Sequence, residues 1–169
     1  ATLDEALSSL AVQTLQDFEI IAVDDGSQDE TPALLRAWQA REPRLRLLCQ
    51  AHGGIVAALN TGLAACTAPL LARMDADDRC HPERLSHQAE ELQTHPEVDV
   101  LGCQVATFPE HVANEGLQRY LAWQNALLTD ADIRREIFVE SPLVHPSVML
   151  RREALVKAGG YQDRGWAED

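Results

Sequence analysis

The chain has 169 residues, and its 46% hydrophobic and 24% charged residues are typical of one globular domain with a buried core. Its 27 acidic residues against 14 basic ones give a formal charge of -13, which repels a phosphate backbone and argues against direct nucleic-acid binding. We therefore predict a single domain over residues 1–169 with no nucleic-acid partner. The acidic surplus either serves solubility or includes carboxylates that cluster to hold a divalent cation.

The cysteines and the longest uncharged stretch bear on the cellular location. The cysteines are far apart and form no Cys-x-x-Cys pair, so we expect reduced, mostly buried thiols and a cytosolic protein: Cys49, Cys66, Cys80 and Cys103. Glycine, asparagine and proline residues interrupt the uncharged stretch 47–72, so we expect no membrane-spanning helix there.

The first half of the chain alternates between helix and strand patterns. Thr2 and Glu5 have the spacing of a capping box ahead of apolar residues at helical intervals. Short apolar runs end at Asp-rich sequences and read as buried parallel strands. The expected elements are a helix from Thr2, a strand over 18–23, a helix over 31–40, a strand over 44–49, a helix over 54–65 and a strand over 69–74.

The second half continues this pattern with softer boundaries. Pro82 stands where the first turn of a helix begins, and the break at His95-Pro96 ends it. The remaining expected elements are a strand over 98–107, helices over 116–128 and 130–138, a strand over 144–150, and a short helix from 152 to the glycines at 159 and 160. The fold class is therefore α/β, with a Rossmann-like, mostly parallel sheet flanked by helices.

Carboxylates follow two of the predicted strands. Asp24 and Asp25 end the first strand, and the sequence Asp75-Ala76-Asp77-Asp78 ends the third. Ligands of an open parallel sheet bind beyond the carboxyl ends of its strands, so five carboxylates there would repel one another unless a cation or hydrogen-bond donors lay between them. Hard cations such as Mg²⁺ or Mn²⁺ prefer such oxygens together with substrate phosphates. The alternative is that Asp24 and Asp75 only cap the turns that follow.

An ordered set of motifs resembles the family 2 glycosyltransferases, which have the A-type nucleotide-diphospho-sugar transferase (GT-A) fold. The set spans nearly the whole chain: Gln13-Thr14, the run 17–27 ending in Asp24-Asp25-Gly26-Ser27, Asp29 with Thr31, Asn60-Thr61-Gly62-Leu63, Met74-Asp75-Ala76-Asp77-Asp78, Pro82-Glu83-Arg84-Leu85, and Trp166-Ala167-Glu168-Asp169. A lone Asp-x-Asp would carry little weight, whereas this ordered set is specific.

The resemblance implies a role for each carboxylate. Asp25 would accept a hydrogen bond from a uracil-like base, and Asp24 would support the loop or the ribose. Asp77 would coordinate Mn²⁺ or Mg²⁺ bridging the diphosphate, while Asp75 would face the ribose or the sugar. Asp169 would be the general base.

Asp169, assisted by the neighbouring charge of Glu168, would deprotonate the acceptor hydroxyl as it attacks the anomeric carbon with inversion. The implied enzyme is a metal-dependent transferase of a hexose or N-acetylhexosamine in bacterial polysaccharide synthesis. Its donor would be a nucleotide-diphospho-sugar such as a UDP-sugar, and its acceptor a saccharide or a lipid-linked acceptor. It would act in the cytoplasm, with peripheral association at the inner face of the membrane.

The chain departs from the family pattern at three points. Family members begin with an apolar strand, which we expect to precede Ala1 in the full protein, and they continue beyond the position of Asp169. Leu59 stands where the family often has a basic residue. We therefore expect the first strand and the C-terminal part of the fold to lie outside these residues, with the acceptor left open.

Aromatic residues and histidines admit more than one interpretation. Trp123, His145 and Trp166 would line an acceptor pocket or fill the core; Trp166 is the favoured acceptor contact, whereas Tyr120 is assigned to the core. The other histidines lack the spacing of a metal site, so no zinc is expected. Two rival functions stay open: a sugar-1-phosphate nucleotidyltransferase, for which the Gly-rich basic N-terminal loop is absent from these residues, and a non-catalytic nucleotide-sugar-binding module.

Overall fold

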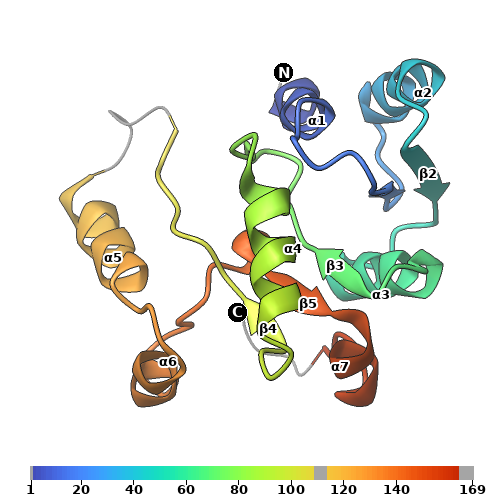
Figure 1. Cartoon of the computed structure of the whole chain (residues 1–169). Coiled ribbons are helices and arrows are strands. Elements are labelled where there is room, and N and C mark those ends of the chain that lie inside the picture. Colours follow the sequence, from blue (N-terminus) through green and yellow to red (C-terminus); the bar gives the residue numbers. More distant parts are fainter. Residues whose placement is uncertain (1, 109–113, 164–169) are drawn as a thin grey trace.

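A computed structural model describes residues 2–108 and 114–163, which form helices packed on short strands (Figure 1). The elements follow the predicted order: α1 Thr2–Ala11, β1 Ile20–Asp24, α2 Thr31–Arg41, β2 Leu45–Cys49, α3 Ile55–Ala65, β3 Leu70–Ala72, α4 Arg84–Thr94, β4 Val100–Leu101, α5 Glu115–Asn125, α6 Asp130–Glu136, β5 Met149–Arg151 and α7 Arg152–Lys157. The α/β class is confirmed.

The described strands form two groups. β1 and β2 are parallel, with Ile20 opposite Leu45 and Asp24 opposite Cys49. In the second group β5 lies between β3 and β4 and runs antiparallel to both, so β3 and β4 share one direction. Between the groups, residues of β1, α3 and β3 line an apolar cleft of about 770 Å³, along strand edges that no described strand covers. The expectation of a further strand before Ala1 stays a prediction.

All the described strands are shorter than predicted, and for β4 and β5 the reason is that pairing, not local pattern, sets their length. β4 stops at Leu101, opposite Met149, because β5 has no earlier residue to pair with. β5 begins only at Met149, since Pro146 lies in a 3-10 turn over His145–Ser147 and has no backbone N–H to donate. Beyond β4, Asn125 replaces a strand partner: its side chain accepts from Val105 N at 2.9 Å and donates to Val105 O at 2.8 Å.

The apolar core has two parts. Leu7 of α1 and Leu35 and Trp38 of α2 pack against Ile20 and Leu45, which explains why these helices lie over β1 and β2. The second part consists of Leu85, Ala89 and Leu92 of α4 packed against Met149 of β5. Figure 1 shows α4 lying across the β3–β5–β4 group, with α5 and α6 to the left of α4 in this view.

Polar side chains buried at α4 join this helix to the rest of the fold. Gln13, which is 1% exposed, donates to His81 O at 2.7 Å and accepts from Leu85 N at 3.1 Å. Gln88 donates to Ser147 O at 2.9 Å and to Leu101 O at 3.0 Å. The side chains of Gln13 and Gln88 thereby give partners to main-chain groups beside the start of α4 and at the ends of short strands.

All four cysteines are free, as expected, but the expectation that most are buried is wrong. Cys80 is buried, Cys66 is partly buried, and Cys49 and Cys103 are exposed. Within residues 2–108 and 114–163, no helix has both the length and the apolar character needed to cross a bilayer.

Replacing Gln13 with leucine should lower the free energy of unfolding by about 2–4 kcal/mol, because His81 O and Leu85 N lose their buried partner. Denaturant unfolding followed by circular dichroism measures this. The control is Gln39→Leu, the same change at an exposed position of α2, which should stay within about 0.5 kcal/mol of the parent. Equal stability of the two variants would contradict the role assigned to Gln13.

Candidate active site

Asp24 ends β1 and shapes the loop that follows. Its side chain is buried, and its Oδ1 accepts from Ser27 N at 3.0 Å, while its main-chain carbonyl accepts from Gln50 N at 2.9 Å. Gly26 has φ +82, and a Cβ there would lie 3.0 Å from His52 N, so the loop needs glycine at this point. Asp24 therefore caps the turn that follows β1, as the alternative interpretation of the sequence expects. Its role toward a nucleotide stays a prediction.

The carboxylate of Asp25 joins the end of β1 to the start of α3. Its Oδ1 accepts from Gln50 Nε2 at 2.6 Å and from Gly53 N at 2.9 Å. Its Oδ2 accepts from Gly54 N at 2.8 Å and lies 2.9 Å from His52 Nδ1. The Gly53 amide, followed by the Gln50 side chain, lowers the pKa of Asp25 below its ordinary value of 3.8.

These four contacts limit how Asp25 can meet a ligand. A carboxylate has about four lone-pair sites, so an incoming imino group must replace an existing donor. His52 is the donor to be displaced, since its side chain is 80% exposed whereas Gln50 is fixed by Thr61 Oγ1 donating to its Oε1 at 2.6 Å. The sequence analysis does not identify these partners of Asp25. The signal for them is the Gly53-Gly54 pair directly before an apolar helix, whose amides donate to the carboxylate.

The loop after β3 carries three carboxylates close to one another. Asp78 N donates to Asp75 O at 3.3 Å, which folds the loop into a turn. Burial first, and then the charges of Asp75 and Asp77, raise the pKa of Asp78. Asp77 is exposed, and within the described residues no ion pair of its carboxylate is found. The loop that follows β3 therefore carries a local cluster of acidic side chains, as the sequence predicts.

The donor set fits a cation that is shared with a substrate. No group of three or more histidine, cysteine, aspartate or glutamate side chains in the described part of the chain is arranged to enclose a metal ion. Mg²⁺ and Mn²⁺ in nucleotide sites need only one or two carboxylates, with phosphate and water oxygens completing the shell. The exposed carboxylate of Asp77 offers that minimal set, while Asp75 is paired with Arg73 at 3.1 Å.

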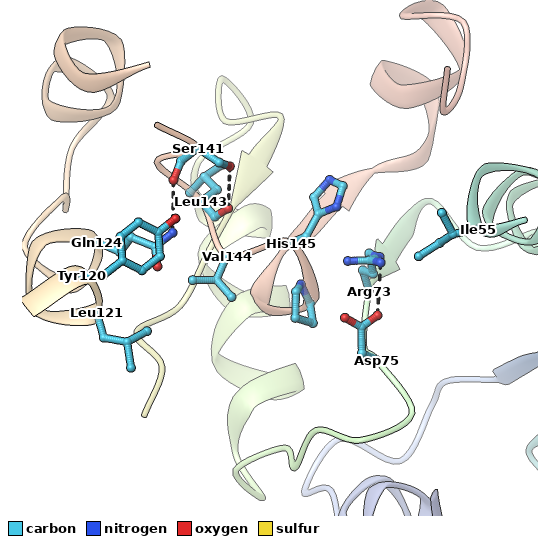
Figure 2. A pocket seen from close by; sticks show the side chains of 11 residues that line it. Ile55, Arg73, Asp75, Tyr120, Leu121, Gln124, Ser141, Leu143, Val144 and His145 are labelled. Carbon is cyan, nitrogen blue, oxygen red and sulfur yellow. Dashed lines mark hydrogen bonds and ion pairs between the residues drawn. The ribbon is translucent and has the colours of Figure 1, made fainter. Parts of the chain in front are cut away.

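A cavity of about 310 Å³ opens beside this loop (Figure 2). Its walls come from the start of α3, the end of β3, α5 and the segment before β5: Ile55, Arg73, Asp75, Tyr120, Leu121, Gln124, Ser141, Leu143, Val144, His145 and Pro146. Ile55 directly follows the Gly53-Gly54 pair that binds Asp25. The neighbourhoods of the two Asp-rich loops therefore meet at one cavity.

The aromatic residues differ partly from expectation. Tyr120 is 38% exposed, lines the cavity and lies 5.6 Å from Trp123 between ring centroids, so its assignment to the core is wrong. Gln124 of α5 donates to Ser141 O at 3.1 Å, whereas Tyr120, one turn earlier on the same face of α5, borders the open cavity. His145 lines the cavity, with its ring 6.4 Å from that of Tyr161, and its contact with an acceptor stays a prediction.

Asn60 holds the last described segment against α3. Its side chain donates to Tyr161 O at 2.8 Å and accepts from Tyr161 N at 3.0 Å. Gly160 has φ +73, and a Cβ there would lie 2.7 Å from Asn60 Oδ1. The motif that contains Asn60 therefore has a structural role. Glu168 and Asp169, the predicted base pair, and Trp166 lie outside the described residues.

Solved structures show which fold the chain has. A mannosyltransferase from Pyrobaculum calidifontis, solved in complex with GDP-Man and Mn²⁺, matches with a TM-score of 0.70 and 24% identity over 95% of this chain and 44% of its own. TarS 1-349 of S. aureus matches with a TM-score of 0.75 and 22% identity over 99% of this chain and 48% of its own. The chain has the A-type glycosyltransferase fold.

The family follows from sequence comparison: the model of glycosyl transferase family 2 matches residues 1–159, and the chain belongs to that family. The amylovoran biosynthesis glycosyltransferase AmsE of Erwinia amylovora is 36% identical over 168 residues, which cover 99% of this chain and 60% of that protein. An Escherichia coli UDP-Gal:alpha-D-GlcNAc-diphosphoundecaprenol beta-1,3-galactosyltransferase is 26% identical over 99% of this chain and 59% of its own length. The chain thus spans about three fifths of these relatives.

Replacing Asp25 with asparagine should lower the melting temperature at pH 7, because one amide oxygen cannot accept from four donors. Since the folded pKa lies below 3.8, the carboxylate stabilises the fold above that pH, and its contribution is lost as the pH falls through the folded pKa. The difference in melting temperature between parent and variant should therefore shrink toward pH 3.

Thermal unfolding at pH 7 and at about pH 3 measures both effects. At about pH 3 an unperturbed aspartate is mostly protonated. His52→Ala is the control, since it removes only the exposed donor and should shift the melting temperature far less. An unchanged melting temperature of Asp25→Asn at pH 7 would show that the carboxylate does not organise the loop.

Proposed function

We propose that the chain is the donor-binding and catalytic part of an inverting, metal-dependent glycosyltransferase. It moves a hexose or N-acetylhexosamine from a nucleotide-diphospho-sugar, with a UDP-sugar as the favoured donor, to a saccharide or lipid-linked acceptor. The observation that carries this proposal is one cavity lined both by Asp75 of the second Asp-rich loop and by Ile55, which follows the glycines bound to Asp25. Asp77, two residues after Asp75, is exposed. Family membership supports glycosyl transfer as the reaction.

The printed names of relatives support the substrate classes. The E. coli relative acts with UDP-Gal on a diphosphoundecaprenol-linked sugar, and TarS has been solved in complex with UDP-GlcNAc. The Pyrobaculum enzyme instead holds GDP-Man, so the nucleotide is the part of the proposal that needs its own test. A lipid-linked acceptor would place the whole protein in the cytoplasm at the inner face of the membrane.

The residues would divide the reaction as follows. Asp25 and Asp24 would hold the nucleotide end, and Asp77 would hold Mn²⁺ or Mg²⁺ together with the donor diphosphate, with Asp75 toward the ribose or sugar. The bound cation would supply neutralising charge for the departing diphosphate. Asp169 would take the proton of the acceptor hydroxyl, with Glu168 raising its pKa.

In the chemical step the acceptor oxygen bonds to the anomeric carbon from the side opposite the nucleotide. The bond between that carbon and the diphosphate oxygen breaks, the electron pair leaves with the nucleotide, and the proton remains on the base. A single displacement of this kind inverts the anomeric centre. The exposed position of Asp77 supports its place beside the leaving group rather than in the core.

Adding Mn²⁺ and UDP should raise the melting temperature of the parent protein, because binding to the folded state alone contributes about 2.7 kcal/mol at a ligand concentration of 100 Kd. The variant Asp77→Ala should lose that gain while keeping its melting temperature without ligand, since its side chain is exposed. Differential scanning fluorimetry measures both.

Asp17→Ala, at an exposed aspartate outside the two loops, is the matched control and should keep the full gain. A ligand-induced gain that is unchanged in Asp77→Ala would refute the metal assignment. A parent protein that neither responds to UDP with Mn²⁺ nor hydrolyses any nucleotide sugar in its full-length form would refute the proposed function.

A further inference from the structure

His52 is an exposed histidine that contacts the carboxylate of Asp25 at the end of β1. Its Nδ1 lies 2.9 Å from Asp25 Oδ2 and 3.3 Å from Asp25 O, although 80% of the side chain is exposed. Gly26 allows this approach, because a Cβ at Gly26 would lie 3.0 Å from His52 N and 3.5 Å from His52 Cα. The loop between β2 and α3 therefore packs closely against the turn after β1 at the point that carries His52.

The four donors around Asp25 differ in how easily they can leave. The amides of the Gly53-Gly54 pair belong to the main chain that opens α3, and Gln50 is held by Thr61, whose Oγ1 donates to Gln50 Oε1 at 2.6 Å. The charge of His52 is the smallest of the influences that lower the pKa of Asp25, after these amides and Gln50. Rotation of the exposed imidazole into solvent thus frees one carboxylate oxygen without any movement of the backbone.

The oxygen that His52 contacts is the one that an incoming nucleobase needs. Uracil and guanine each carry an imino N–H that can donate to a carboxylate, and a carboxylate whose four lone-pair sites are taken cannot accept a further donor. A nucleotide therefore binds to Asp25 only in the conformation that His52 has left. The apparent affinity for the nucleotide is reduced by the fraction of molecules in that conformation.

The strength of the contact depends on the charge of the imidazole. Histidine side chains ordinarily change charge between about pH 5 and about pH 8, and a protonated imidazole beside a carboxylate forms an ion pair in place of a neutral hydrogen bond. Asp25 is the carboxylate in contact with the ring, whereas the neighbouring Asp24 accepts from Ser27 N at 3.0 Å. Because the pKa of Asp25 lies below 3.8, Asp25 stays charged throughout this range and only the imidazole titrates.

We propose that the contact between His52 and Asp25 is autoinhibitory and pH-dependent: protonated His52 competes with the nucleobase for Asp25, and neutral His52 is displaced more readily. This inference rests on the proposed function, since it concerns access to the nucleotide site. It gives His52 an effect opposite to that of a residue that binds the ligand, because its removal tightens nucleotide binding.

The test measures the affinity of the full-length protein for UDP and for GDP with Mn²⁺, by calorimetry at about pH 5.5 and about pH 8. At the lower pH, His52→Ala should bind the nucleotide about two- to fivefold more tightly than the parent, which is the range that an exposed ion pair contributes. At the higher pH the ratio of the two affinities should fall toward one.

Other groups titrate in the same range, and the ratio of affinities removes their effect. The terminal phosphate of the nucleotide loses a proton there, and burial raises the pKa of Asp78 in the other acidic loop. Both changes are common to the parent and to His52→Ala, so a ratio that varies with pH reports His52 alone.

Two further variants complete the design. His52→Gln keeps a hydrogen-bonding side chain without the charge, and its affinity relative to the parent should change with pH in the same direction as that of His52→Ala. His95→Gln is the matched control, because His95 is also a histidine beside carboxylates, with its Nδ1 3.1 Å from Glu97 Oε1 and its Nε2 3.4 Å from Glu91 Oε1. It lies at the end of α4 and should leave the affinity of the parent unchanged at both pH values.

The inference is overturned if His52→Ala has the affinity of the parent at both pH values, or if the ratio does not change with pH. Weaker binding by His52→Ala would also overturn it, because His52 would then be a contact of the bound nucleotide. A parent protein that binds neither UDP nor GDP would instead defeat the proposed function, and with it this inference.

Discussion

The geometry of the site depends on polar side chains of α4 that bind main-chain groups at the ends of short strands. β3, β4 and β5 have three, two and three residues, too few to satisfy the carbonyls beyond their ends by strand pairing. Arg84 donates to Arg73 O at 2.8 Å and to Gln88 Oε1 at 3.0 Å. Gln88 donates to the carbonyls of Leu101, the last residue of β4, and of Ser147, which precedes β5. The Asp-rich loop after β3 therefore begins from a point fixed by α4.

A second constraint aligns the other loop with the first. Asp25 accepts from the amides that open α3, and α3 then contributes Ile55 to the cavity wall that Arg73 and Asp75 also form. A chain with a formal charge of -13 could not gather these carboxylates without compensation. The compensation is local: backbone amides and Gln50 at Asp25, and the guanidinium of Arg73 at Asp75.

The order of elements and the positions of the acidic loops could be predicted from sequence. The periodicity of apolar residues and the positions of glycine and proline depend only on neighbouring residues in the chain. The lengths of β4 and β5 could not, since each depends on how many residues its partner offers. The same limit applies to the site. Asp24, Asp25, Asp75 and Asp77 stand out in the sequence, but the partners that set their chemistry come from elsewhere: Gln50 lies 25 residues from Asp25, and the His145 wall of the cavity belongs to a distant segment. Helical spacing alone does not show that the face of α5 carrying Tyr120 meets an open cavity.

We propose that the two acidic loops bind opposite ends of one cation-bound sugar nucleotide. A crystal structure of the full-length protein with Mn²⁺ and UDP, using the anomalous signal of manganese to locate the ion, tests this claim most directly. The account predicts manganese bound to Asp77 and the diphosphate, with the uracil at Asp25 and His52 displaced from it. Manganese bound away from the loop after β3, or UDP bound with neither Asp25 nor Asp77 in contact, would contradict it.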